Sequence, residues 1–378
     1  MPIANTADFR KAAQKRLPRL FFDYLDGGSY GERTLRQNVS DLEAVALRQR
    51  VMVDVSHRAL EAEWFGRKIA MPVGLGPVGF TGMFRHRGEV QAARAAHKFN
   101  VPACVSTLGI CGIEEITENS GAPVWQQFYM IRDRAFMADF LQRIAAARSP
   151  VLVFTADLPA VGARYRDTHS GMSGSGALGF LRQAWQGVSH PAWLWDVQIT
   201  GGPHIFGNLA KAVPDAKGAG QFQAWVNANL DATVSWKDIE WVRARWKGPI
   251  VLKGVLDPAD AKQALAAGAD GIIVSNHGGR QLDGALSSIR ALPAIADALG
   301  GALPILMDGG VRSGLDVLRA MAHGAQGVLL GRAWAYALAA QGEAGVTRLL
   351  QIIRDELSFA MAMTGCTDIR RAGRDLLA

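Results

Sequence analysis

The chain has 378 residues, of which 49% are hydrophobic and 20% are charged. This composition can bury a large core, which excludes an intrinsically disordered protein. The formal net charge of +7 can favour nucleic acids, anionic membranes or anionic substrates. Because the sequence has no long block of Lys or Arg and no zinc-finger or RNA-binding pattern, we expect no nucleic-acid partner.

The cysteines indicate the compartment. Cys104, Cys111 and Cys366 lack the spacing of a metal site or a CxxC motif, so we expect free thiols in a reducing environment and no bound metal. Residues 1–19 carry scattered charges without an apolar core, and no apolar run reaches the length of a membrane-spanning helix. We therefore expect a cytoplasmic protein, with attachment to a membrane surface left open.

A repeating pattern fills most of the chain after residue 69: a short apolar run, a polar or glycine-rich turn, and a stretch with helical periodicity. The apolar runs are mostly continuous rather than alternating, as in parallel strands that are buried on both faces. We predict eight strands, over residues 72–75, 102–106, 124–128, 151–155, 250–253, 271–275, 304–307 and 327–330.

The segments between these strands predict amphipathic helices. Their ranges are 88–99, 133–147, 236–246, 258–267, 287–299 and 314–323. Asp257 and Ser313 stand where N-caps are needed. Eight strands that alternate with helices favour an α/β protein with a single (β/α)8 TIM barrel. The alternative is an open Rossmann sheet, but no GxGxxG turn follows the first strand.

Three segments fall outside the repeat. Residues 7–50 predict an N-terminal helical cap, and residues 343–363 predict a closing C-terminal helix. A long insertion, about 159–235, follows the fourth strand and holds four of the ten tryptophans. A connection of this length is usually functional, so we interpret it as a lid, or as a membrane-contact surface because Trp favours lipid interfaces. We expect residues 1–378 to form one domain around these parts.

Two glycine turns predict a phosphate site. Gly309 and Gly310, followed by Arg312, come after the seventh strand, and Gly331-Arg332 comes after the eighth. In a barrel, backbone N–H groups and cations at these two strand ends commonly bind phosphate. The alternative, two ordinary turns with surface arginines, does not explain why both occur at the expected strands.

Strand ends also carry candidates for acid–base chemistry. His277 follows the sixth strand among glycines and lies three residues before Arg280, a natural partner for a carboxylate. The other seven histidines have no comparable setting. Lys253 ends the apolar fifth strand, where a lysine either forms a Schiff base or stabilises negative charge. A surface lysine is the alternative, but it fits poorly at the end of a buried strand.

The segment Ser-Asn-His-Gly-Gly-Arg-Gln-Leu-Asp at 275–283 resembles the active-site signature of the FMN-dependent α-hydroxy-acid dehydrogenases and oxidases. The resemblance extends over nearly the whole chain, including residues 22–28, 127–129, 253–254, 308–310 and 331–332. Within that family, residues 162–173 and 235–238 are most similar to the bacterial quinone-linked L-lactate dehydrogenases. The resemblance implies an enzyme that binds FMN and oxidises a small L-2-hydroxy acid to the 2-oxo acid.

The resemblance also implies roles for individual residues. His277 would take a proton from the substrate, and Asp157 would stabilise the resulting imidazolium. Arg164 and Arg280 would hold the substrate carboxylate. Tyr24 and Tyr129 would hydrogen-bond the carboxylate and the hydroxyl or nascent carbonyl. These roles agree with the chemistry, because the reaction needs a base, cations and an electron acceptor.

The same resemblance implies a cofactor site. Lys253 would lie near flavin N1 and the C2 carbonyl and favour negative charge there. The residues expected around the flavin ring are Pro77, Gly79, Ser106, Gln127, Thr155 and Ser275. The residues expected around the ribityl chain and phosphate are Asp308, Gly310, Arg312, Gly331 and Arg332.

Two positions decide between members of the family. Position 79 is Gly where oxidases commonly have Ala, which favours quinone over oxygen as the electron acceptor. Leu108 stands where some members carry a bulky aromatic residue, so mandelate-like or longer substrates stay open. The alternatives within the family are therefore an oxygen-using hydroxy-acid oxidase and an (S)-mandelate dehydrogenase. The resemblance further implies a homo-oligomer, a tetramer by analogy, at the inner face of the cell membrane.

Two alternatives lie outside this family. A nucleotide-binding barrel with an isomerase or inosinate-dehydrogenase-like reaction would share the phosphate glycines. It should lack Arg164 together with His277 and Arg280, and the inosinate type needs a catalytic cysteine loop that the three cysteines do not provide. A non-catalytic membrane scaffold would have no need for the acid–base residues.

Overall fold

The computed structural model describes residues 2–172, 176–202, 204–213, 225–226 and 228–378. Within this part of the chain, eight parallel strands form one sheet in the order β3-β10-β9-β8-β7-β6-β5-β4. The ring closes where Leu75 of β3 pairs with Ala103, just before β4. The strands are β3 (Val73–Leu75), β4 (Cys104–Val105), β5 (Trp125–Phe128), β6 (Leu152–Thr155), β7 (Ile250–Val255), β8 (Gly271–Val274), β9 (Ile305–Met307) and β10 (Gly327–Leu330). The predicted (β/α)8 barrel is therefore confirmed, and the Rossmann alternative is wrong.

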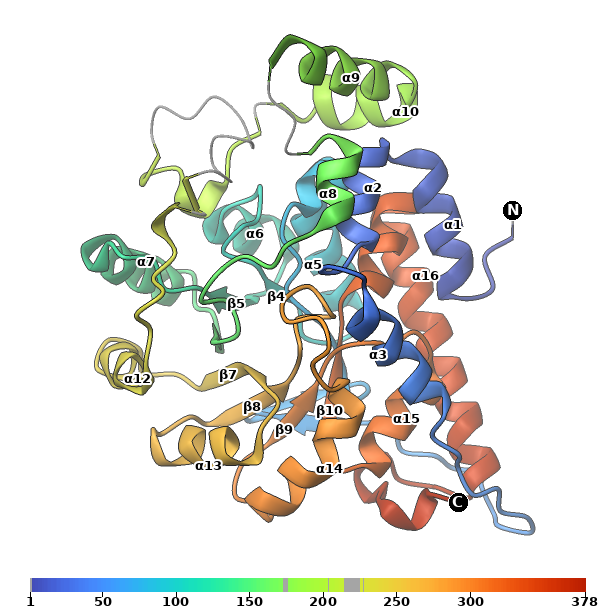
Figure 1. Ribbon diagram of the computed structural model, residues 1–378. Helices are drawn as coiled ribbons and strands as arrows, with labels where there is room; N and C mark the ends of the chain where they lie inside the picture. The colour runs from blue at the N-terminus through green and yellow to red at the C-terminus, as the bar shows by residue number, and fades with distance from the viewer. Residues whose placement is uncertain (1, 173–175, 203, 214–224, 227) are drawn as a thin grey trace.

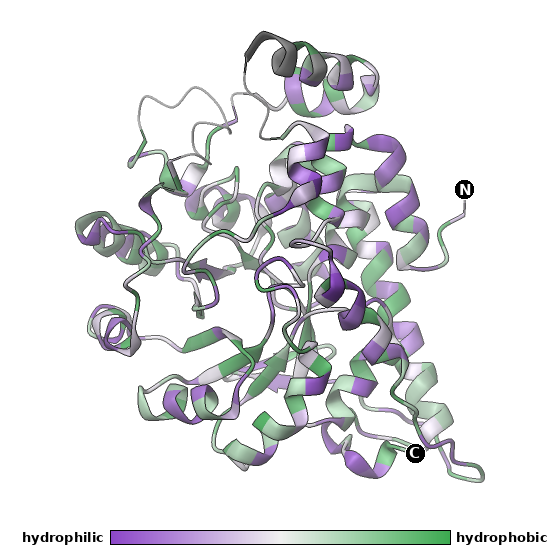
Figure 2. Ribbon diagram, viewed as in Figure 1, coloured by the Kyte–Doolittle hydropathy of each residue, from purple (hydrophilic) through white to green (hydrophobic). Residues whose placement is uncertain are grey.

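Helices surround this barrel (Figure 1). They are α4 (Thr81–Phe84), α5 (Gly88–Lys98), α6 (Ile113–Ser120), α7 (Arg134–Ala146), α12 (Trp236–Arg243), α13 (Pro258–Ala266), α14 (Ser288–Leu299) and α15 (Gly314–Ala322). The predicted caps are present: the Asp257 side chain accepts a hydrogen bond from the backbone of Ala259, and Ser313 forms a capping box with Asp316. Figure 2 shows the strands as mostly hydrophobic and the helices as mixed, because each helix buries only one face against the sheet.

The helical cap is shorter than residues 7–50. Its helices are α1 (Thr6–Arg16), α2 (Arg19–Asp26) and α3 (Arg33–Glu43), and no helix follows within residues 44–61. A hairpin of β1 (Ala62–Trp64) and β2 (Arg67–Ile69), which we did not predict, comes next. Trp64 is buried against Trp125 and the inward side chains of several barrel strands, so the hairpin plugs the end of the barrel opposite to the strands' carboxyl ends.

The C-terminal helix is longer than residues 343–363. Helix α16 (Arg332–Thr364) starts directly after β10 and contains a break at Gly342, which has φ 63°. The barrel's eighth helix and the closing helix are thus continuous around one glycine in the left-handed region. Two short helical turns, η3 (Ile369–Arg371) and η4 (Arg374–Leu376), complete the chain.

The long insertion is mostly helical where the structure describes it. It contains α8 (Tyr165–Ser170), α9 (Gly176–Val188), α10 (Pro191–Trp193), η1 (Leu194–Ile199) and η2 (Gly207–Leu209). Figure 1 shows α9 and α10 as an outer layer beyond α8 and the N-terminal helices. Residues 173–175, 203, 214–224 and 227 of the insertion lie outside the described residues. No described helix combines the length and apolar character needed to cross a bilayer.

Candidate active site

One cavity lies at the carboxyl ends of the strands and encloses about 1170 Å³, including open solvent at its mouth. The predicted site residues that line it are Tyr24, Pro77, Gly79, Ser106, Tyr129, Thr155, Arg164, Lys253, His277, Arg280, Asp308, Gly310, Arg312, Gly331 and Arg332. The other three, Gln127, Asp157 and Ser275, lie behind it and hydrogen-bond Thr155, His277 and Lys253 respectively. The fold therefore brings together every predicted site residue.

His277 follows β8 with φ 58°, a backbone conformation that is uncommon for a residue other than glycine. Its Nδ1 atom lies 2.9 Å from Oδ1 of Asp157, which follows β6, and its Nε2 atom lies 3.5 Å from the Tyr129 hydroxyl. Because the carboxylate accepts the Nδ1 proton, Nε2 is left to accept a proton. Burial lowers the pKa of His277, and Lys253 and Arg164 add to this, although Asp157 opposes them.

A glycine lets Asp157 approach this histidine. Gly254 in β7 has φ 104°, and a Cβ atom there would lie 2.5 Å from Cβ of Asp157. The pairing of β7 with β8 also shifts its register at this residue. Burial would raise the pKa of Asp157, but His277 and Lys253 outweigh it and lower that pKa, so the group is a carboxylate.

Lys253 is buried, with 4% of its side chain exposed. Its Nζ atom donates to Ser275 Oγ over 2.9 Å and lies 3.1 Å from Oδ2 of Asp308. Burial would lower the pKa of Lys253, but Asp308 and Asp157 outweigh it and raise that pKa. The residue is therefore a fixed cation at the floor of the cavity, which excludes the surface-lysine alternative.

Two arginines face Tyr24. The guanidinium carbon of Arg280 lies 4.6 Å from the centre of the Tyr24 ring, and that of Arg164 lies 5.9 Å from it. The nearest carboxylate to Arg164 is Asp167, 3.9 Å away, and the buried Nε of Arg164 has no hydrogen-bond partner among the described residues. Burial, with Arg280 adding to it, lowers the pKa of Arg164 to about 10. This pair can hold a carboxylate.

The cavity also has residues that suit a phosphate. Arg332 is the first residue of α16, whose N-terminus therefore lies at the cavity, and Arg312 lines the same wall. Gly310 has φ 87°, and a Cβ atom there would lie 2.0 Å from the carbonyl oxygen of Asn38, so the turn requires glycine. Burial lowers the pKa of Arg332 to about 9 although Tyr336 opposes it, and Arg280 adds to the lowering.

The charges of the cavity fit an anionic cofactor together with an anionic substrate. Its described lining residues include Lys253 and four arginines, against the single carboxylate of Asp308. Such an excess of cations with limited exposure favours a bound phosphate and a bound carboxylate. Ser106, Gln127 and Thr155 form a connected polar group beside them, with Gln127 bonded to both of the others. FMN would bring the phosphate and a polar ring edge that these groups can bind.

The sequence reasoning missed part of this site. Leu158, Val161, Val226 and Leu230 join Leu108 in an apolar part of the lining. Asn38 and Asn276 exchange two hydrogen bonds of 2.8 Å and thereby fix the turn that carries His277. No local pattern marks the apolar residues, because they come from separate segments.

The three cysteines do not line the cavity. Cys104, Cys111 and Cys366 are free and buried, as expected, and none of them lines it. Burial raises the pKa of each thiol, which disfavours the nucleophilic thiolate that an inosinate-type reaction needs. Within the described part of the chain, no three His, Cys, Asp or Glu residues gather as a metal site would require.

Comparison with known proteins identifies the family. The model of the FMN-dependent dehydrogenases matches residues 13–378. The chain is 56% identical to the L-lactate dehydrogenase of Caulobacter vibrioides (strain NA1000 / CB15N) over 378 residues, covering all of this chain and 98% of the relative. It is 55% identical to that of Stenotrophomonas maltophilia (strain R551-3) over 377 residues, covering 100% and 99%.

Solved structures agree with this assignment. The monotopic membrane protein (S)-mandelate dehydrogenase superposes with a TM-score of 0.94 at 33% identity, with both chains fully covered. Mandelate oxidase with benzoyl-formic acid superposes with a TM-score of 0.83 at 36% identity, covering 100% of this chain and 98% of the other. With a matching family model, full-length relatives and a cavity that fits the cofactor, this chain belongs to the FMN-dependent dehydrogenase family, and FMN is its cofactor.

Proposed function

We propose that this enzyme oxidises L-lactate, or a similar small L-2-hydroxy acid, to the 2-oxo acid and passes the electrons from FMN to a quinone. The observation that carries the proposal is the position of His277, a base paired with Asp157, in the same cavity as Arg164 and Arg280. The relatives from Caulobacter and Stenotrophomonas, which are named L-lactate dehydrogenases, support lactate as the substrate.

In this proposal, Arg164 and Arg280 bind the substrate carboxylate, and Tyr24 donates a hydrogen bond to it. Tyr129 binds the hydroxyl or the nascent carbonyl beside Nε2 of His277. As the 2-carbon is oxidised, Nε2 takes a proton from the substrate, and Asp157 stabilises the imidazolium that forms. FMN, when bound, supplies the acceptor for the two electrons.

The cofactor residues keep the roles that we expect from the sequence. Lys253 would hold its positive charge against the flavin ring, which makes the ring a better electron acceptor. Pro77, Gly79, Ser106, Gln127, Thr155 and Ser275 would surround the ring. Asp308, Gly310, Arg312, Gly331 and Arg332 would hold the ribityl chain and phosphate.

Quinone as the acceptor requires access to a membrane, and the insertion offers a surface for this contact. Leu181, Trp185 and Val188 are exposed on α9, at the spacing of one helix face. Trp195 and Ile199 are exposed on η1. Exposed Trp beside aliphatic side chains favours a lipid interface. The structural neighbour described as a monotopic membrane protein supports this reading.

The insertion also has the character of a lid. Trp193 is buried, packs 5.2 Å from Phe21 between ring centres, and donates a hydrogen bond to the Met83 carbonyl. Val161 and Val226, near its two ends, line the cavity. We propose that one side of the insertion closes the active site while α9 and η1 contact the inner face of the cell membrane from the cytoplasm.

We further propose that residues 1–378 form one domain and that the enzyme assembles as a homo-oligomer, a tetramer by analogy with its family.

For the substrate, the apolar lining around Leu108 favours a second candidate, (S)-mandelate, because it can accommodate a larger side chain than a methyl group. Oxygen stays the alternative acceptor.

The experiment is to mix the purified holoenzyme anaerobically with L-lactate and follow the visible flavin absorbance. We expect bleaching by L-lactate and not by D-lactate, slow recovery in air and fast recovery with a quinone analogue. Rapid recovery in air with release of hydrogen peroxide would make the protein an oxidase. Bleaching by mandelate and not by L-lactate would identify the second candidate, and bleaching by neither would refute the proposed substrates.

A further inference from the structure

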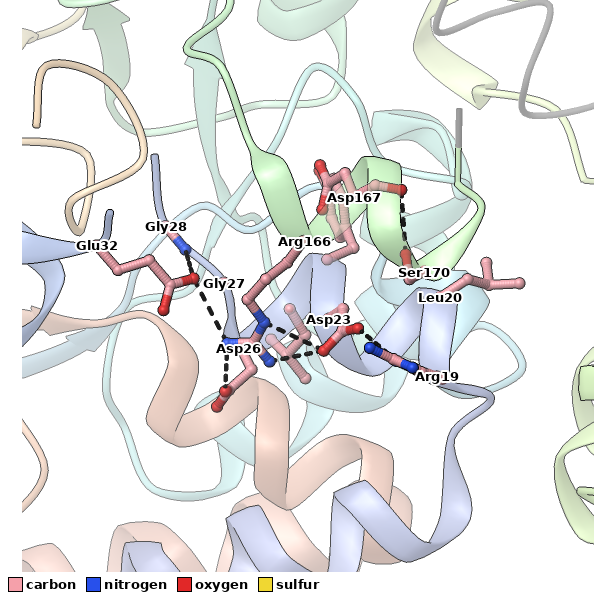
Figure 3. Close-up of polar contacts among 12 residues, drawn as sticks. Arg19, Leu20, Asp23, Asp26, Gly27, Gly28, Glu32, Arg166, Asp167 and Ser170 are labelled. Atoms are coloured by element: carbon pink, nitrogen blue, oxygen red, sulfur yellow. Dashed lines mark hydrogen bonds and ion pairs between the residues drawn. The ribbon is translucent and has the colours of Figure 1, made fainter. Parts of the chain in front are cut away.

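A cluster of ion pairs outside the cavity joins the insertion to the N-terminal cap. Arg166 of α8 reaches α2, where its Nη2 lies 2.7 Å from Oδ1 of Asp23 and its Nη1 lies 2.9 Å from Oδ2 of Asp26 (Figure 3). Glu32 lies 3.5 Å from the same guanidinium. The side chains of Asp23 and Asp26 are only 10% and 6% exposed. Water therefore screens these charges less than it screens a surface ion pair, and each contact contributes more to holding α8 on α2.

Asp26 connects this cluster to two more helices. Its carboxylate accepts hydrogen bonds of 2.6 and 2.8 Å from Arg10 of α1 and one of 2.6 Å from the Tyr336 hydroxyl of α16. Burial would raise the pKa of Asp26, but Arg10, Tyr336 and Arg166 outweigh it and lower that pKa below its ordinary value. Asp26 is therefore a carboxylate that ties together α1, α2, α8 and α16.

Helix α2 in turn orders the active site. It carries Tyr24, and the carbonyl oxygens at its C-terminal end accept hydrogen bonds from two cavity arginines. Arg280 donates to the carbonyl of Gly27 over 3.0 Å, and Arg332 donates to it over 2.7 Å. Any rotation of α2 would thus move Tyr24 and both arginines together.

Arg164 has no hydrogen bond to the end of α2 like those of Arg280 and Arg332. It is the N-cap residue of α8, and its buried Nε atom has no hydrogen-bond partner among the described residues. Its ion pair with Asp167 is long, at 3.9 Å. The backbone of α8 therefore decides where its guanidinium lies. Arg166, two residues further on, is the charged contact that fixes this backbone against α2.

We propose that Arg166 is a positioning residue, which fixes α8 on α2 so that Arg164 and Tyr24 face the same substrate carboxylate. This inference rests on the proposed function, because it needs a carboxylate substrate at Arg164. Neutral contacts also hold the segment: Tyr30 N–H donates to the Ala163 carbonyl, and Gln186 donates to that of Ser170. A variant that loses Arg166 should therefore still fold with its insertion in place.

The test compares Arg166→Met and Arg166→Lys with the matched control Arg10→Met, all as holoenzymes. Arg10→Met removes a two-bond pair from the same Asp26 without touching the insertion. The first readout is the Kd for oxalate, a dicarboxylate that resembles the acid end of the substrate, from the change in flavin absorbance. The second is the division of any loss between KM and kcat for L-lactate, and the third is FMN content.

We expect Arg166→Met to raise the Kd for oxalate and the KM for L-lactate about ten- to a hundredfold, because charge-assisted hydrogen bonds are lost. FMN content should be unchanged, and the effect on kcat should be smaller. Arg166→Lys should recover part of the loss because it keeps the charge without the two-pronged geometry. Arg10→Met should bind oxalate like the wild type. In Arg164→Met, the further change Arg166→Met should add little, because both act through one guanidinium.

Three results would overturn the inference alone: oxalate binding by Arg166→Met at wild-type affinity, an equal loss in Arg10→Met, or full additivity with Arg164→Met. Failure of the wild type to bind oxalate and to be reduced by any 2-hydroxy acid is a different result. It would overturn the proposed function and, with it, the role of Arg166.

Discussion

The Nδ1 atom of His277 lies 2.9 Å from Oδ1 of Asp157, while Oδ2 of that carboxylate is buried without a hydrogen-bond partner among the described residues. Positive charge on the imidazole would therefore be the main source of stabilisation for a carboxylate that is already buried. Asp157 therefore lowers the free-energy cost of protonating His277 below the cost for a buried imidazole without a carboxylate partner. This is what a base needs if it must hold a proton at the end of the chemical step.

Replacement of His277 by Gln should remove the base and keep the shape of the site. We expect the rate of flavin reduction by L-lactate to fall about 10²- to 10⁴-fold, the usual contribution of a general base. FMN binding should persist, because His277 is not among the residues that we propose to hold the phosphate or the ring. His97→Gln, at an exposed position of α5, is the matched control. Full activity in His277→Gln would exclude the catalytic role and revive the non-catalytic alternative.

The pH dependence follows from the lowered pKa of His277. A base works in its neutral form, so kcat/KM should rise with pH, and the midpoint of the rise should lie below the ordinary histidine pKa of about 6.5. Asp157→Asn removes the charge that raises this pKa, so the rise should move to still lower pH. The plateau should fall on the order of a hundredfold, because the imidazolium loses its partner. Rapid-mixing rates from pH 4.5 to 8 would show both effects; an unmoved or upward-shifted profile would contradict this assignment.

Gly79→Ala tests the electron acceptor. A Cβ atom at this position would lie 3.4 Å from the side chain and carbonyl of Leu108 and 3.6 Å from the Tyr24 hydroxyl, so it fits with at most small adjustments. We expect the variant to keep reduction by L-lactate within about tenfold of wild type and to react faster with oxygen. Recovery of the flavin spectrum in air, with peroxide as the product, measures this. Unchanged or slower reoxidation would contradict the interpretation that glycine at position 79 disfavours oxygen as the electron acceptor.

The double variant Trp185→Ser/Trp195→Ser tests the membrane surface. Trp185 and Trp195 are 72% and 64% exposed, so the change should not disturb the fold. A Trp side chain that enters the lipid interface contributes strongly to membrane binding. We therefore expect cosedimentation of the double variant with anionic vesicles to fall about tenfold or more. Phe359→Ser, at an equally exposed aromatic of α16 outside the insertion, is the control. Equal binding by the double variant and the wild type would rule out these tryptophans as the contact.

Local sequence patterns were sufficient to predict the barrel. Each predicted strand overlaps an observed one, since a strand between two layers shows a continuous apolar run that ends in a turn. Asp257 and Ser313 cap the helices as expected, because a cap depends on the residues next to it. The hairpin at 62–69 had no such signal: its turn at Phe65 and Gly66 uses a left-handed Phe, and its Trp64 is buried by strands from the rest of the barrel.

The sequence by itself determined the eight-stranded barrel and the glycine turns and polar side chains at the strand ends, because these follow from periodicity, turn chemistry and position at a strand end. Only the tertiary structure decided which side chains meet. Asp157 is 120 residues from His277, and Asp23 is 143 residues from Arg166. Neither contact leaves a local pattern, since each depends on how separate helices and strands pack. The fold thereby set the charge around His277 and paired Arg166 of α8 with two carboxylates of α2.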